Sequence, residues 1–71
     1  MFPNPANNTI TINFEVPQQI VQINTFNYLG QKMDMHFDLT NRADIRILQR
    51  GIYFTEIITN KDKYSCRWVK I

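Results

Sequence analysis

The sequence predicts a small antiparallel all-β sandwich, and three observations support that prediction. Apolar and polar residues alternate over several short runs, as they do in strands with one buried face. Turn-forming residues separate these runs about every 8–12 residues, which is typical of all-β sandwiches. No stretch has the spacing of an amphipathic helix.

The length of the chain limits it to one small domain. Its 71 residues correspond to a size at which folding buries about 60% of the surface of the unfolded chain. We therefore expect a single domain over residues 1–71 with marginal stability. Residues 1–8 form its lead-in, which we expect to be extended because Pro3 and Pro5 fix their own φ angles and restrict the residues before them.

The first half of the chain contains three candidate strands. Thr9–Glu15 alternates with Ile10, Ile12 and Phe14 on one face, and Pro17 then marks a loop. Ile20–Tyr28 resumes the alternation, with Val21, Ile23 and Thr25 on one side. Gly30, which adopts positive φ without steric cost, predicts a tight turn over Leu29–Lys32. A third strand is expected over Met33–Leu39.

The second half begins with Thr40–Asp44, a polar stretch that predicts a loop, followed by a short apolar step over Ile45–Leu48. A turn at Gly51 then leads into Ile52–Ile58, the most β-prone run in the chain, which predicts a buried or nearly buried strand with Tyr53, Thr55 and Ile57 on one side. A turn over Asn60–Lys63 precedes a last strand over Tyr64–Ile71, with Tyr64, Cys66 and Trp68 on one face and Val69 on the other. We expect six or seven short strands in all. The expected shape is immunoglobulin-like, without the Cys, Trp, Cys spacing of true immunoglobulin domains.

Composition argues against several classes of function. The net charge is only +2 and the basic residues are scattered, whereas nucleic-acid binding needs a concentrated basic face. Cys66 and His36 lie in different predicted strands without a catalytic spacing. Asp34 and Asp38 are about 13 Å apart along a strand, too far to hold one metal ion without another chain segment. We therefore expect no catalytic, cofactor-binding or metal-binding residues, no cofactor and no nucleic-acid partner.

Four blocks occur in order along the chain: Phe2–Pro5, Asn27–Lys32, Gly51–Phe54 and Trp68–Ile71. Together they resemble the type A carboxy-terminal sorting domain of the type IX secretion system, also called the Por secretion system, of Bacteroidota. The resemblance covers essentially the whole chain. It implies a sorting motif made of Pro3, Asn4, Pro5, Leu29, Gly30, Gly51, Tyr53, Val69, Lys70 and Ile71.

The resemblance implies a seven-stranded immunoglobulin-like domain that catalyses nothing. It would direct an attached cargo from the periplasm across the outer membrane to the cell surface or the medium. Its expected partners are the outer-membrane translocon and a surface sortase. The cargo domain would lie on the amino-terminal side, and neither it nor an export signal is expected within these 71 residues.

Two further expectations remain open. One alternative function is a free-standing adhesion or carbohydrate-binding module, because exposed aromatic rings stack on sugars. The candidate rings are Tyr28, Tyr53, Tyr64 and Trp68, although their alternation favours packing within the sheets. The other expectation is a weak homodimer through edge strands.

Overall fold

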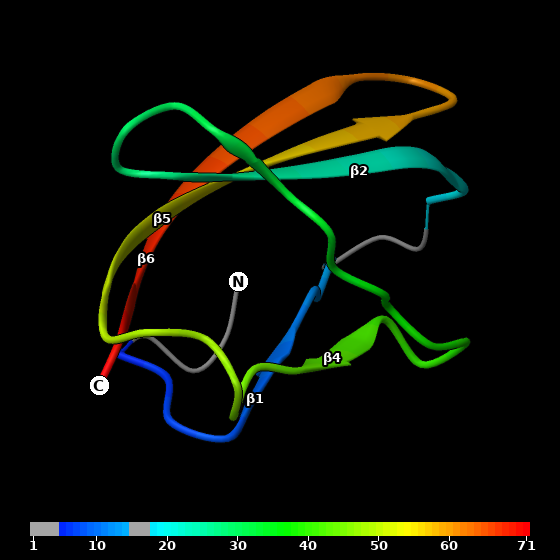
Figure 1. Ribbon diagram of the computed structural model, residues 1–71. Coiled ribbons are helices and arrows are strands. Elements are labelled where there is room, and N and C mark those ends of the chain that lie inside the picture. Colours follow the sequence, from blue (N-terminus) through cyan, green and yellow to red (C-terminus); the bar gives the residue numbers. More distant parts are fainter. Residues whose placement is uncertain (1–4, 15–17) are drawn as a thin grey trace.

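The computed structural model describes residues 5–14 and 18–71 and contains two antiparallel β-sheets (Figure 1). The antiparallel all-β prediction is therefore confirmed, with six strands among these residues where the family resemblance implies seven. No helix in the described part of the chain is long and apolar enough to cross a membrane. The strands are β1 (Thr9–Thr11), β2 (Ile20–Asn27), β3 (Lys32–Met33), β4 (Arg42–Asp44), β5 (Gly51–Thr59) and β6 (Lys63–Lys70).

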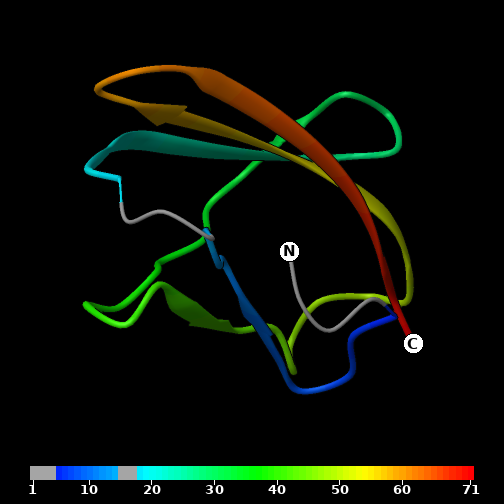
Figure 2. The ribbon, with the colours of Figure 1, turned by 180° about the vertical axis from the view of Figure 1, so that it is seen from behind.

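The larger sheet has the strand order β3-β2-β5-β6 and the smaller one pairs β1 with β4. In the larger sheet Thr25 is opposite Thr55, and Tyr53 is opposite Trp68. Figures 1 and 2 show the larger sheet curving over the smaller one. The residues that fill the space between the sheets are Ala6, Ile10, Ala43, Ile45, Tyr53 and Trp68.

Strand β5 supports this core with one face only. Tyr53, Thr55 and Ile57 are buried, whereas Ile52 and Phe54 on the opposite face are 38% and 44% exposed. The predicted division of side chains between the two faces is confirmed. The prediction of a buried or nearly buried strand is wrong for the outer face, because no second layer in the described chain covers that face of the larger sheet.

The segment after β3 differs most from expectation. The strand predicted over Met33–Leu39 pairs only at Lys32–Met33, because the chain then crosses to the smaller sheet. Met35 and Phe37 still pack against the core during this crossing. The alternation of apolar residues here therefore reflects contact with the core and not pairing with another strand. The polar stretch predicted as a loop contains β4, which pairs with β1 and buries only Ala43.

Strand β2 contains an irregularity that turns Val21 away from the side predicted for it. Its register against β5 shifts between Ile20 and Gln22. Such a bulge reverses the side to which the residues before it point. Val21, which alternation places with Thr25, is therefore 64% exposed while Thr25 is buried.

Candidate functional site

The described residues of the predicted sorting motif gather at one end of the larger sheet. Gly51 begins β5 opposite Lys70 near the end of β6, and Tyr53 is opposite Asn27 at the end of β2. The turn after β2 and the end of β6 therefore lie on the same side of the molecule, on the left in Figure 1. Pro5 is exposed beside the end of β6, whereas Pro3 and Asn4 lie outside the described residues.

The turn after β2 is organised by Asn27. Its side-chain oxygen accepts hydrogen bonds from the main-chain nitrogens of Leu29 and Gln31, both at 3.0 Å. Gly30 has a φ of 83°, as predicted for this turn. Tyr28 and Leu29 are 72% and 65% exposed. The turn thus presents two large apolar side chains to solvent on a hydrogen-bonded frame.

Tyr53, in contrast, is part of the core. Its ring stacks on Trp68 with the centroids 4.9 Å apart, and its hydroxyl donates a hydrogen bond to the main-chain oxygen of Gln49 at 2.6 Å. Burial raises the pKa of the Tyr53 hydroxyl. Tyr53 therefore ties the segment before β5 to the larger sheet.

Trp68 belongs to the fourth block of the family resemblance but is not among the predicted motif residues. It is fully buried, and its indole nitrogen donates to the hydroxyl of Thr55 at 2.9 Å. The Thr55 hydroxyl also bonds to that of Thr25 at 2.9 Å. The alternation of Tyr64, Cys66 and Trp68 predicted that these three side chains share a face, but the sequence offered no signal for the partner Thr25.

A groove of about 290 Å³ joins the turn to the beginning of β5. Its walls include Tyr28 from the turn, Ile47 and Arg50 from the loop before β5, and Ile52 from β5 itself. The lining residues include no carboxylate, so Arg50 is the only ionised side chain among them. The groove brings together the second and third blocks of the predicted motif.

The tail consists of the last three residues of the sequence, Val69, Lys70 and Ile71. Lys70 is only 7% exposed, and its ammonium group donates to the main-chain oxygen of Ile71 at 3.0 Å. Ala6 pairs with Lys70 as an isolated parallel bridge. The tail therefore has Gly51 and Ile52 along one edge and Ala6 along the other.

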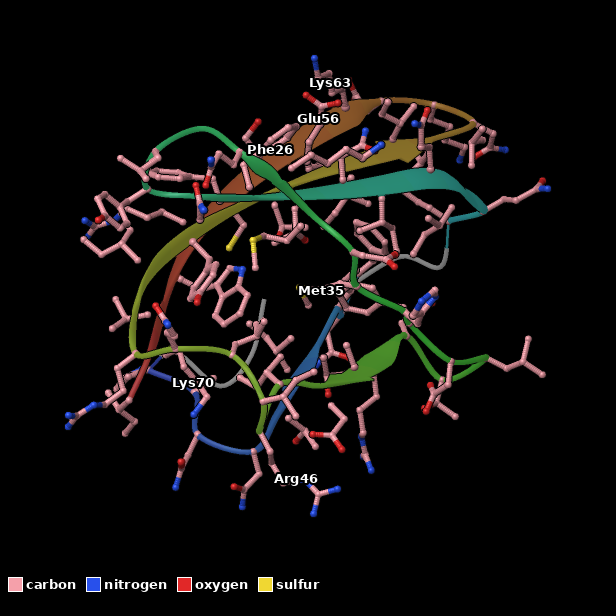
Figure 3. The ribbon with its side chains drawn as sticks, in the orientation of Figure 1. Phe26, Met35, Arg46, Glu56, Lys63 and Lys70 are labelled. Carbon is pink, nitrogen blue, oxygen red and sulfur yellow. The ribbon has the colours of Figure 1, made fainter. Side chains whose placement is uncertain are left out.

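Charged side chains elsewhere form pairs outside this end of the sheet. Lys63 lies 3.1 Å from Glu56 on the outer face of the larger sheet (Figure 3), and its hydrogen bond, with a second from Asn24, lowers the pKa of Glu56. Arg46 lies 2.7 Å from Asp44 and holds the pKa of Asp44 at about 2. These pairs are surface ion pairs that contribute little to stability.

The residues considered for catalysis or metal binding do not come together. His36 and Asp34 form a highly exposed pair at 3.5 Å, and Cys66 is partly buried on β6. Among the described residues, no three His, Cys, Asp or Glu side chains are grouped as metal ligands. The candidate site offers a partner main-chain hydrogen-bonding groups and exposed apolar side chains.

Comparison with known proteins identifies a family for this chain. No curated protein and no solved structure matches this chain. The family model described as "Secretion system C-terminal sorting domain" matches residues 1–71, the whole chain. The chain therefore belongs to the family of secretion system C-terminal sorting domains.

Proposed function

We propose that the exposed turn at Tyr28–Gly30, together with the tail, is the surface by which the type IX outer-membrane translocon recognises this domain. Membership of the family makes the chain a C-terminal sorting signal for type IX secretion, which exports proteins across the outer membrane to the cell surface or the medium. The observation that supports the proposal is the gathering of the described motif residues at one end of the larger sheet.

The turn is the stronger half of this surface. Tyr28 and Leu29 are held out on a hydrogen-bonded frame, and burying such side chains against a partner contributes about 1.5–3 kcal/mol each. Neither side chain contributes to the core, so their exposure has no explanation in the packing of the domain. Recognition by a partner gives these apolar side chains a role.

The remaining parts of the proposal concern the fate of the exported protein. The domain of residues 1–71, with its lead-in, carries a cargo on its amino-terminal side and is a substrate of a surface sortase. It performs no catalysis itself, and its sandwich is related to immunoglobulin-like domains. The family is non-catalytic in general, which supports the absence of enzymatic activity in this chain.

The carbohydrate-binding alternative receives little support. A sugar platform needs exposed rings, and both Trp68 and Tyr53 are buried in the core. Among the four candidate rings, only Tyr28 is largely exposed, at 72%, and Tyr64 is partly buried. A weak homodimer through edge strands stays a prediction, and the pairing of Ala6 with Lys70 shows that the end of β6 is not an open edge.

The test is a reporter that carries a periplasmic export signal, fused ahead of residues 1–71 in a bacterium with the type IX system. We expect translocon-dependent appearance of the reporter at the surface or in the medium. Leu29→Ser should reduce this export at least about tenfold, which corresponds to the loss of about 1.4 kcal/mol of binding. The matched control is Leu39→Ser, since Leu39 is a fully exposed leucine in the loop before β4.

Equal export of the two variants would contradict the proposed role of the turn. Retention of the unmodified fusion in the periplasm would contradict the proposed function as a whole. Removal of the tail is a poorer test. Lys70 is buried and paired with β5, so truncation removes part of the fold along with any recognised surface.

A further inference from the structure

Ala6, in the described part of the lead-in, occupies the edge of the tail that a strand-adding partner would need. Ala6 donates its main-chain N–H to the oxygen of Val69 at 2.7 Å and accepts a hydrogen bond from the nitrogen of Ile71 at 2.8 Å. These two bonds satisfy main-chain groups on either side of Lys70, as in a parallel strand pair. The opposite edge of β6 is taken by β5.

The side chain of Ala6 fixes this arrangement further. Ala6 is fully buried and belongs to the core cluster with Trp68 and Tyr53. Two residues later, the main-chain oxygen of Asn8 accepts a hydrogen bond from the nitrogen of Ile45, on the segment that follows β4. The lead-in is therefore held at Ala6 by β6 and at Asn8 by the segment that follows β4.

The contact is also small enough to open. Ala6 pairs with the end of β6 as a single residue and not as part of a strand, and Pro5 and Asn7 on either side of it are exposed. Segments with few buried contacts open locally at a free energy well below that of global unfolding. Release of Ala6 would uncover the oxygen of Val69 and the nitrogen of Ile71 without breaking the pairing of β5 with β6.

We propose that the lead-in is a releasable latch, and that the tail binds its partner by exchanging Ala6 for an extended polypeptide strand that runs parallel to β6. The incoming strand must place a small side chain where Ala6 lies, because that position is enclosed by the core. This inference rests on the proposed function only in assigning the tail to recognition. The competition for the edge itself is a property of the isolated domain.

The first measurement is amide hydrogen exchange of Ile71, whose N–H donates to Ala6. Ala6→Asp buries an unpaired carboxylate in the closed latch, so we expect Ile71 to exchange at least about tenfold faster. Asn7→Asp is the matched control, because it adds the same charge at the neighbouring exposed position and should leave the exchange unchanged. The indole N–H of Trp68 reports whether the core is intact.

A milder variant keeps the test valid if Ala6→Asp unfolds the domain. Pro5→Gly changes an exposed residue and increases the freedom of the released lead-in, so exchange of Ile71 should accelerate about two- to fivefold. Unchanged exchange in Pro5→Gly, or in a folded Ala6→Asp variant, would overturn the latch.

The second measurement supplies the strand in trans, as a labelled synthetic peptide with the sequence of residues 1–8. We expect its fluorescence anisotropy to rise with the Ala6→Asp domain, or with Pro5→Gly if the former is unfolded, and to stay lower with the parent. A peptide carrying leucine at the position of Ala6 should not bind. Equal binding of the first peptide to parent and variant, or binding to neither, would overturn strand exchange.

These results separate the latch from the proposed function. If the lead-in is released and the peptide binds, but the reporter is not exported, the latch is supported and the sorting role of this surface is refuted. If the reporter is exported, but amide exchange of Ile71 is the same in the parent and the variants, the sorting role is supported and the latch is refuted.

Discussion

The corner formed by Tyr53 and Trp68 and the turn at Tyr28–Gly30 belong to the same end of the larger sheet but differ in burial. The corner is buried, with stacked rings and both ring donors hydrogen-bonded. The turn exposes Tyr28 and Leu29 on a frame built by Asn27. Both regions come from blocks that carry the family resemblance, so membership of a motif does not by itself indicate which residues a partner contacts.

The difference assigns separate tasks to the two regions. Substitution in the corner should reduce the free energy of unfolding, and any loss of export would then follow from loss of the fold. Substitution in the turn should leave the fold in place, so that a loss of export reports on recognition. The cost of substitution in unfolding free energy should therefore decrease from the corner to the turn.

The largest effect is expected for Trp68→Ala. Trp68 is fully buried and contacts Tyr53 and Thr55, so its removal leaves a cavity and should cost about 3–5 kcal/mol. In a domain of 71 residues this is enough to unfold much of the population. Urea unfolding followed by circular dichroism measures the loss, because the variant lacks the only tryptophan. A cost below about 1 kcal/mol would contradict the structural role of the corner.

Tyr53→Phe should have a smaller effect, because it keeps the ring and removes one hydrogen bond to Gln49. We expect a loss of about 0.5–1.5 kcal/mol near neutral pH. Trp68→Phe is a useful comparison, since it keeps an aromatic ring at the corner and removes the donor to Thr55. A stability for Tyr53→Phe equal to that of the parent would show that water replaces this hydrogen bond.

The pH dependence of the free energy of unfolding, compared between the parent and Tyr53→Phe, checks the burial of the Tyr53 hydroxyl. Its pKa is raised in the folded state, so above about pH 10 the unfolded chain ionises first and is favoured. The contribution of the hydroxyl is therefore fully present below the unfolded pKa and is lost as pH rises through the folded pKa. The stability difference between the parent and Tyr53→Phe should shrink over that range, and a constant difference would contradict burial.

The sequence predicted those parts of the fold that depend on local pattern. Strict alternation in β5 and β6 correctly divided Tyr53 and Trp68 from Ile52 and Val69, and Gly30 marked a real turn. Alternation failed where burial occurs without pairing, as at Met35, and where pairing occurs with little burial, as in β4. Pairing is a property of two segments, and the pattern of one segment does not determine it.

The sequence proposed a set of candidate site residues but did not predict where in the fold they lie. The assembly of the site depends on the non-local register that sets Asn27 beside Tyr53 and Gly51 beside Lys70. The burial of Lys70 and the pairing of Ala6 with it had no signal in the sequence, because a lysine ordinarily stays in water and a single alanine carries no pattern. The latch therefore became visible only with the strands in place.

Asn27→Ala should loosen the turn at modest cost. It removes the acceptor for the nitrogens of Leu29 and Gln31, and we expect a loss of about 0.5–1 kcal/mol because water can reach both nitrogens. Amide exchange should accelerate at these two positions and remain slow in β5. Gln31→Ala is the control, since it keeps the Asn27 oxygen and removes only a side-chain bond. Equal effects of the two variants would show that Asn27 does not organise the turn.

The smallest effect on stability is expected for Leu29→Ser. Leu29 is 65% exposed and lies outside the core, so the free energy of unfolding should change by less than about 0.5 kcal/mol, as for Leu39→Ser. Urea unfolding of the two variants beside the parent measures this. A loss above about 1 kcal/mol in Leu29→Ser alone would make the turn a structural element like the corner. Equal stability of the two variants, combined with an export defect in Leu29→Ser alone, would mean that the translocon contacts the turn directly.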